Sequence, residues 1–257
     1  MDAGNAVTVE RINILKVPLD IVPPETLTEQ VYAMLVPEEN GQIKGKNLIL
    51  LSLWDLLRAR GNNEYRDFVQ KASMIIPISK SLIGGARFLT GKIPARYMPF
   101  DFVVTLLTIL ENRELSVYLL GSKARALKKT EKKIHQTFPK LRIVGRFKGN
   151  FRRQDEGVIM EAIRKASPSL LLVGQGVHGG EQWIARNTGS LNPGLRLWCS
   201  DIFDVFAARK KRPSRATFDR GLEWFGYCWQ NPLHFFRIFP YFYYKLLLLI
   251  YRVFKKS

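Results

Sequence analysis

Glycines that follow a short apolar run near residue 170 form a candidate phosphate site. The run Leu170 to Val173 is too short for an independent helix, which indicates a buried strand. It ends in a turn rich in glycine: Gly174, Gly176, Gly179 and Gly180. Backbone amides at a glycine-lined helix start can hold a phosphate. Such turns also form where the backbone needs positive φ angles, so the glycines alone leave both interpretations open.

Acid, base and polar side chains surround this turn. His178 lies within it and could donate to a phosphate or accept a proton near neutral pH, although loop histidines are often idle in solvent. Glu181 is expected in the first turn of the next helix, where the helix dipole stabilises a carboxylate whatever the function. Asp201 and Asp204 close a later strand and could contact a sugar or uracil, or only form Asx turns.

A basic run after residue 208 could bind diphosphate and lipid phosphate. Its cations have no carboxylate among them until Asp219, which argues against an ordinary solvated charged face. Its members are Arg209, Lys210, Lys211, Arg212, Arg215 and Arg220.

The overall charge also points to an anionic partner. The formal charge of the 257 residues is +18 and the pI is about 10.1. Nucleic acid, an acidic membrane surface and a phosphorylated substrate are the partner classes that fit. No nucleic-acid-binding module is recognisable, so nucleic acid is retained only because of the charge and is not the expected partner.

The cysteines and histidines argue against disulfides and metal sites. Cys199 and Cys228 are widely separated and no secretory leader is recognisable, so we expect a reducing, cytosolic compartment. The histidines are scattered, and none has a second ligand at helical spacing: His135, His178 and His234. We therefore expect neither a metal nor another cofactor.

Strand and helix patterns alternate along the chain, which is typical of a parallel sheet with crossover helices. The expected strands are Arg11–Leu19, Lys46–Leu53, Met74–Pro77, Ser116–Leu120, Leu141–Gly145, Leu170–Val173 and Leu195–Trp198. The first expected helix begins after Pro23-Pro24 and runs through Val36. The others are Trp54–Arg60, Tyr65–Ala72, part of Ser79–Leu89, Asp101–Leu110, Lys123–Phe138 and Asp155–Ala166. The predicted fold is an α/β, Rossmann-like core over residues 1–204, with a basic and aromatic helical appendage over residues 205–257.

The appendage predicts association with a membrane surface. A spanning helix needs about 20 mostly apolar residues, and Arg237, Pro240, Lys245 and Arg252 interrupt this segment. Aromatic rings mixed with Lys and Arg suit a helix that lies among lipid headgroups. The alternative is an ordinary amphipathic helix that packs back on the core.

Several blocks of the sequence resemble the WecG/TagA/CpsF glycosyltransferase family, in the family's order and over nearly the whole chain. The most specific block is GLEWFGYCWQNPLHFFR at Gly221–Arg237. The others are RINILKVPLD near the start, Leu119-Leu120-Gly121, Gly149-Asn150-Phe151, Gly174-x-Gly176 with Glu181 and Trp183, Phe203-Asp204 and Lys211-Arg212-Pro213.

The resemblance implies a membrane-associated, inverting enzyme with a Rossmann-like core. Such an enzyme would transfer an N-acetylhexosamine, such as N-acetylmannosamine, from a UDP-sugar to a polyprenyl-diphosphate-linked acceptor during cell-surface polysaccharide synthesis. It would lie on the cytoplasmic side of the cell membrane, and a homo-oligomer is compatible with it. No Asp-x-Asp pair is present, which fits a metal-independent reaction in which Arg and Lys receive the diphosphate charge.

The chain departs from the family where polar residues are expected. The family's catalytic aspartate falls in a Pro-Asp-Gly step, which here reads Pro77-Ile78-Ser79, and isoleucine cannot accept a proton. Leu50-Leu51-Ser52 replaces a Thr-x-Asn step, which leaves Ser52 and Ser79 as candidate substrate contacts with Gly121. Asp101 is the remaining candidate for the base, or it is a helix N-cap. The alternative function is a non-catalytic homologue that binds a lipid-linked sugar or a nucleotide sugar and scaffolds a partner.

Overall fold

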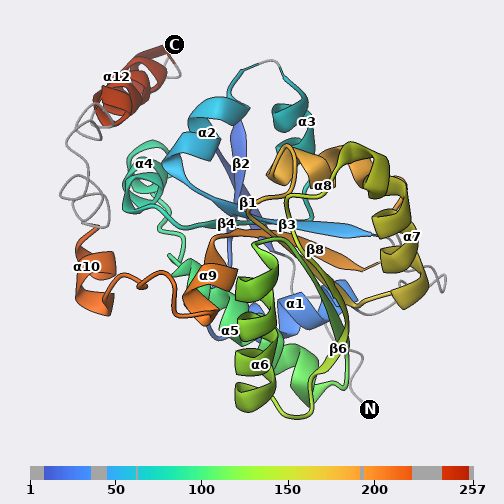
Figure 1. Ribbon diagram of the computed structural model, residues 1–257. Coiled ribbons are helices and arrows are strands. Elements are labelled where there is room, and N and C mark those ends of the chain that lie inside the picture. The colour runs from blue at the N-terminus through green and yellow to red at the C-terminus, as the bar shows by residue number, and fades with distance from the viewer. Residues whose placement is uncertain (1–8, 36–44, 62, 192–193, 222–238, 255–257) are drawn as a thin grey trace, which may run out of the picture.

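The computed structural model describes residues 9–35, 45–61, 63–191, 194–221 and 239–254. Its centre is a six-stranded sheet with the strand order β4-β3-β8-β7-β5-β6, and every neighbouring pair is parallel. The strands are β3 (Lys46–Leu51), β4 (Met74–Pro77), β5 (Ser116–Leu120), β6 (Arg142–Phe147), β7 (Leu170–Gly174) and β8 (Leu195–Ser200). The predicted Rossmann-like α/β class is confirmed (Figure 1).

Helices cover both faces of the sheet, as parallel strands joined by crossovers require (Figure 1). One face packs against α2 (Leu53–Ala59), α3 (Glu64–Gln70), α4 (Lys80–Thr90), α7 (Glu156–Ala166), α8 (Glu181–Asn187) and α12 (Phe239–Phe254). The other face packs against α1 (Leu27–Leu35), α5 (Pro99–Asn112), α6 (Ala124–Thr137) and α9 (Ile202–Phe206). A 3-10 turn, Arg153–Asp155, precedes α7, and α10 (Arg215–Arg220) follows α9.

Alternation along the strands divides the core between these faces. In β3, Ile49 and Leu51 belong to the first hydrophobic cluster and Leu48 to the second. In β7, Leu171 and Val173 pack on the first face, while Leu170 and Leu172 pack on the second. Because both faces of β4, β5 and β7 are buried, these strands are nearly continuous apolar runs, which is why the sequence located them well.

The first predicted strand was wrong in one respect. Arg11–Leu19 is not a single strand but part of an antiparallel hairpin of β1 (Glu10–Ile14) and β2 (Val17–Ile21). Leu15 and Lys16 form the turn with φ values of 51° and 70°. Positive φ at both central residues suits a tight hairpin, but this turn lacks the Asn-Gly or Asp-Gly signal that normally predicts one.

An ion pair whose carboxylate is buried fixes this hairpin to the edge of the sheet. Arg11 Nε donates to Asp20 Oδ1 at 2.6 Å, and Asp20 Oδ2 accepts from the backbone N–H of Ile75 in β4 at 2.7 Å. Asp20 is only 1% exposed, so removal of Arg11 would leave a buried carboxylate with less compensation.

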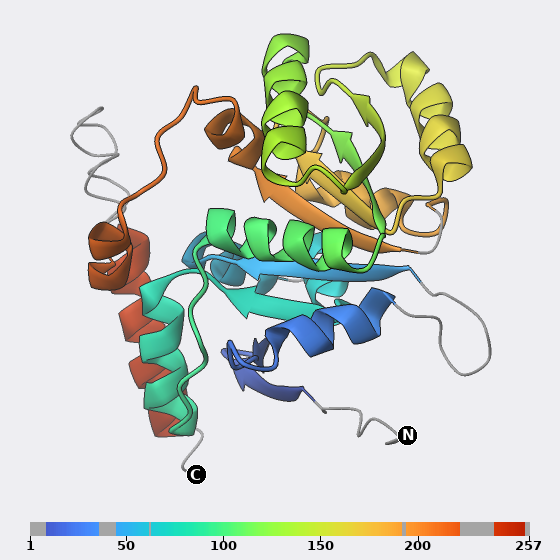
Figure 2. The ribbon, with the colours of Figure 1, turned by 90° about the horizontal axis from the view of Figure 1, so that it is seen from below.

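The C-terminal helix α12 lies beside α4 (Figure 2). Tyr244 and Leu248 are buried at this contact and belong to the first hydrophobic cluster. Gly85 of α4 provides the space, since a Cβ there would lie 1.9 Å from Tyr244 Oη. One face of α12 therefore packs on the core, as the alternative interpretation of the appendage expected.

The opposite face of α12 remains apolar and exposed. Its exposed side chains include Phe242, Leu246, Leu249 and Val253. None of the helices that the structure describes is both long enough and apolar enough to cross a membrane. Most of the GLEW block, residues 222–237, lies outside the described residues, as do Cys228 and His234. The division at residue 204 stays a prediction.

Candidate functional site

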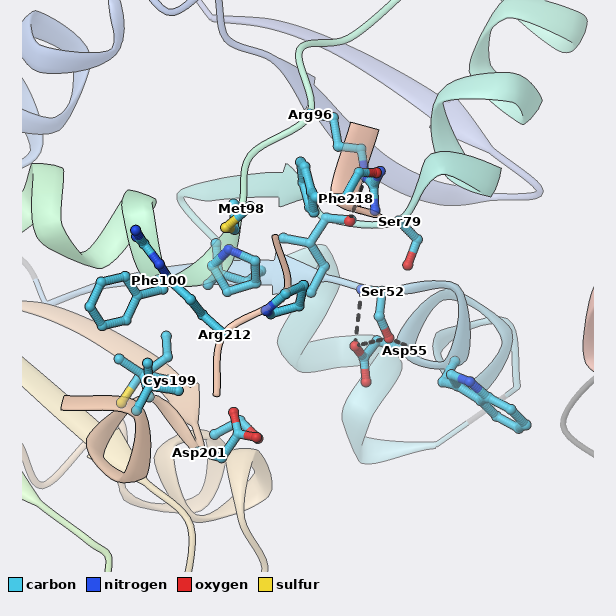
Figure 3. A pocket seen from close by; sticks show the side chains of 18 of the residues that line it. Ser52, Asp55, Ser79, Arg96, Met98, Phe100, Cys199, Asp201, Arg212 and Phe218 are labelled. Carbon is cyan, nitrogen blue, oxygen red and sulfur yellow. Dashed lines mark hydrogen bonds between the residues drawn. The ribbon is translucent and has the colours of Figure 1, made fainter. Parts of the chain in front are cut away.

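A cavity of about 610 Å³ lies where β3, β4 and β8 end. In parallel α/β sheets this edge is where ligands bind, since the loops that leave the strands diverge there. Its walls include Ser52 after β3, Ile78 and Ser79 after β4, and Ser200 and Asp201 at the end of β8. Figure 3 shows Ser52 and Asp55 on one side of the cavity and Cys199 and Asp201 on another.

The wall after β3 is a hydrogen-bonded helix start. Ser52 caps α2, and its Oγ accepts from the backbone N–H of Asp55 at 3.3 Å. The Ser52 N–H and hydroxyl both donate to Asp55 Oδ2, at 3.0 and 2.5 Å. Ser79 Oγ accepts from the N–H of Leu53 at 3.1 Å, which joins the end of β4 to the same turn. This capping box holds the Asp55 carboxylate in a defined place beside the cavity.

A second carboxylate, Glu181, lines the cavity from the first turn of α8. Its Oε2 accepts from Tyr65 Oη of α3 at 2.7 Å. Burial, and after it the nearby Asp55 carboxylate, together raise the pKa of Glu181 to about 8, although the Tyr65 hydroxyl and the charge of Arg58 oppose the shift. Burial also raises the pKa of Asp55, although its bonds from Ser52 and the charge of Arg58 oppose the shift. The cavity therefore contains paired carboxyl groups that favour proton binding.

Cationic side chains line the rest of the cavity, and several are held by contacts. Lys80 Nζ donates to the backbone oxygen of Asp219 at 2.9 Å. Arg96 Nε donates to the oxygen of Ile78 at 2.8 Å, and its guanidinium lies 3.7 Å from the centre of the Phe218 ring. The lining cations are Lys80, Arg96, Lys210, Lys211 and Arg212. Together they outnumber the lining carboxylates Asp55, Glu181 and Asp201, so the cavity suits an anionic ligand.

The basic segment after α9 is attached to the cavity by ion pairs. Lys210 Nζ pairs with the carboxylate of Asp201. Arg212 pairs with Asp101 at 3.2 Å, and its guanidinium lies 5.6 Å from the centre of the Phe100 ring. Asp101 is not the N-cap of α5, because that position is Met98 and Pro99 begins the helix. Asp101 does not line the cavity itself but holds a side chain that does.

The predicted glycines lie at close backbone contacts beside the cavity. A Cβ on Gly121 would lie 2.8 Å from the backbone of Gly174, and one on Gly174 would lie 2.6 Å from the Phe203 ring. Gly176 has a φ of 89° and faces Gly149 and Asn150. The N–H of Gln175 donates to the oxygen of Ser200 at 2.7 Å. These glycines do not line the cavity, and their close contacts favour a packing role, while phosphate binding at this turn stays a prediction.

The remaining predicted residues lie outside the cavity lining. Asp204 accepts from Ser122 Oγ at 3.0 Å and from Gln175 Nε2, and Arg209 lies 3.5 Å from it. His178 is exposed on the turn before α8. Arg215 and Arg220 are exposed on α10. The fold thus brings Ser52, Ser79, Glu181, Asp201 and Arg212 together, but not the others.

Sequence reasoning missed Asp55, Tyr65, Lys80 and Arg96. The spacing of Ser52 and Asp55 is that of a capping box, so that pair was recognisable as a helix start. Lys80 directly follows Ser79 beyond the end of β4, and Arg96 reaches the cavity from the segment between α4 and α5, but neither carries a comparable signal in the sequence. Among the described residues, no group of His, Cys, Asp or Glu side chains is arranged to hold a metal ion.

Comparison with known proteins connects the sequence of this chain to one family. Over 171 residues the chain is 24% identical to the N-acetylglucosaminyldiphosphoundecaprenol N-acetyl-beta-D-mannosaminyltransferase of Bacillus subtilis (strain 168), and the match covers 66% of each chain. The chain thus matches slightly less than two thirds of that relative's length. The model of the family described as "Glycosyl transferase WecG/TagA/CpsF family" matches residues 12–257. The chain therefore belongs to the WecG/TagA/CpsF family of glycosyltransferases.

Proposed function

We propose that this chain is a glycosyltransferase that moves an N-acetylhexosamine from a UDP-sugar to a polyprenyl-diphosphate-linked acceptor. N-acetylmannosamine is the proposed sugar, since the name of the Bacillus subtilis relative specifies an N-acetylmannosaminyl group and an N-acetylglucosaminyldiphosphoundecaprenol acceptor. The reaction inverts the anomeric centre and serves cell-surface polysaccharide synthesis. Family membership and the site at the strand ends support this proposal.

The convergence of cations on a strand-end cavity is the observation that favours it most. A departing nucleoside diphosphate develops negative charge, and fixed positive side chains stabilise that charge. Lys211 and Arg212, from the segment after α9, line the cavity together with Lys80 and Arg96. Ser52, Ser79, Glu181 and Asp201 supply hydroxyl and carboxylate groups that suit a sugar or uridine.

The position of α12 supports a lipid-linked acceptor. Tyr241, in the first turn of this helix, lines the cavity, so the exposed apolar face of α12 begins near the cavity. That face suits insertion among lipid headgroups at the inner surface of the cell membrane. Arg215 and Arg220 on α10 are exposed and could meet lipid phosphates there.

The alternative, a non-catalytic binding protein, rests on Ile78. This residue lines the cavity where the resemblance leads one to expect a catalytic aspartate, and it cannot accept a proton. The carboxyl groups of Asp55 and Glu181 line the same cavity, however, and could accept one. The enzymatic interpretation is therefore the better supported of the two.

Acceptor-dependent release of UDP tests the proposal. Purified chain is incubated with UDP-N-acetylmannosamine and a short-chain polyprenyl-diphosphate N-acetylglucosamine, and UDP is measured with and without the acceptor. We expect release that requires the acceptor and falls at least tenfold in Arg212→Ala. The matched control is Lys128→Ala, an exposed cation on α6 outside the cavity lining. Binding of UDP-sugar without any release would instead favour the scaffold.

A further inference from the structure

The cavity lining includes carboxyl groups that the proposed reaction can use. Asp55 is placed by the capping box at the start of α2, and Glu181 by the first turn of α8. These helices come from distant parts of the chain, yet both side chains line the cavity. The charge of Asp55 acts on Glu181 strongly enough to perturb its ionisation. Ionisation of Asp55 therefore opposes ionisation of Glu181.

Each carboxylate has one oxygen held by the protein. Both bonds from Ser52 end on Asp55 Oδ2, and the Tyr65 hydroxyl donates to Glu181 Oε2. Within the described part of the chain, Asp55 Oδ1 and Glu181 Oε1 accept no hydrogen bond. A carboxylate held through one oxygen keeps its orientation while the other oxygen can accept a proton.

We propose that Asp55 is the general base of the transfer and that Glu181 is its proton-holding partner. This inference rests on the proposed function. The acceptor hydroxyl loses its proton to Asp55 as its oxygen bonds to the anomeric carbon of the donor sugar. The bond between that carbon and the β-phosphate oxygen breaks, and UDP leaves with the electron pair. The lining cations receive its charge, and the proton passes from Asp55 to solvent.

The neighbours of the pair keep one proton on it near neutral pH. The groups that face Glu181 are Asp55 and Arg58 from α2 and Tyr65 from α3. Because a second negative charge beside Asp55 is unfavourable, Glu181 retains its proton while Asp55 ionises, which leaves one carboxylate ready to accept. This arrangement supplies the proton acceptor that Ile78 cannot provide.

Kinetics of Asp55→Asn and Glu181→Gln test the pair. For Asp55→Asn we expect kcat for UDP release to fall about 100-fold or more, with UDP affinity by calorimetry within threefold of wild type and an unchanged melting profile. Formate should partly restore the kcat of Asp55→Ala, since a small carboxylate can replace the missing base. For Glu181→Gln we expect the inflection near pH 8 in the kcat profile to disappear. Asp67→Asn, an exposed carboxylate of α3, is the control.

The possible outcomes separate the two proposals. If wild type releases UDP and folded Asp55→Asn keeps its kcat within threefold, Asp55 is not the base, although the transferase function stands. If Asp55→Asn loses activity together with UDP affinity, and formate restores nothing, the carboxylate contributes to binding and the base assignment is overturned. If wild type shows no acceptor-dependent release, the proposed function itself fails, and the role of the pair fails with it.

Discussion

Tyr65 Oη donates a hydrogen bond to Glu181 Oε2 at 2.7 Å, which joins α3 to α8 beneath the cavity. The Arg58 guanidinium lies 4.4 Å from the centre of the Tyr65 ring, so α2 belongs to the same contact. Burial and the neighbouring carboxylates raise the pKa of Tyr65, which therefore remains a neutral donor at physiological pH. The folded structure accommodates Glu181 in its neutral form, whereas burial of the ionised carboxylate at this site costs free energy.

The stability of the chain should depend on pH through Glu181. Its folded pKa of about 8 lies above its ordinary value of 4.5. Between these values the folded state holds a proton that the unfolded state has lost, so this group's contribution to stability falls as pH rises. Glu181→Gln cannot ionise, and it should gain stability relative to wild type by roughly 1 to 3 kcal/mol between pH 5 and pH 8.

Chemical denaturation of both proteins across this pH range measures the effect. Asp67→Asn serves as the exposed control and should follow wild type at every pH. Parallel stability curves for wild type and Glu181→Gln would show that Glu181 titrates as an ordinary surface carboxylate.

Neighbouring glycines of α4 should respond in opposite ways to alanine. A Cβ on Gly84 would have no atom within 4 Å, whereas one on Gly85 would lie 1.9 Å from Tyr244 Oη. Gly84→Ala should therefore stabilise the chain by about 0.5 to 1 kcal/mol, because alanine favours the helix. Gly85→Ala should displace Tyr244 and loosen α12.

Hydrogen exchange of α12 amides and thermal denaturation distinguish the variants. We expect faster exchange throughout α12 only in Gly85→Ala. Equal protection of α12 in both variants would mean that Tyr244 moves aside without cost and that its contact does not hold the helix.

Gly174 should prove to be a packing residue. The Cβ of Gly174→Ala would lie 2.6 Å from the Phe203 ring, which is completely buried. Overpacking of this kind costs about 1 to 3 kcal/mol, so the melting temperature should fall while UDP affinity of the folded protein stays near that of wild type. Gly157→Ala, on an exposed turn of α7 with no atom near its Cβ, is the matched control. Loss of UDP affinity without loss of stability would restore the phosphate-binding interpretation of this turn.

How far the sequence predicted the fold depended on burial. The strands β4 and β5 were located at their observed bounds, because strands buried on both faces are continuous apolar runs with sharp ends. The hairpin turn at Leu15 and Lys16 was missed because its positive φ angles occur in residues that rarely adopt them.

The candidate site was harder to predict, because it is assembled by topology. The glycine turn after β7 dominated the sequence pattern, yet the cavity lies at the ends of β3, β4 and β8. Asp55 and Glu181 are more than a hundred residues apart, and no local pattern indicates that α2 and α8 converge. Short-range signals predict an element, whereas a site also depends on the order of strands in the sheet.

The exposed face of α12 should determine binding to anionic vesicles. Leu246 and Leu249 are 55% and 56% exposed, while Tyr244 and Leu248 hold the opposite face against the core. The double variant Leu246→Ser and Leu249→Ser therefore removes exposed apolar surface without removing the packing, and it should reduce sedimentation with phosphatidylglycerol vesicles several-fold.

The matched control is Val158→Ser, which alters an exposed apolar residue on α7 and should sediment like wild type. We expect zwitterionic vesicles to bind wild type weakly, since an exposed apolar helix face binds more strongly when cations such as Lys245 and Arg252 can also meet anionic lipid. Unchanged sedimentation of the double variant would show that the exposed apolar face of α12 does not drive vesicle binding.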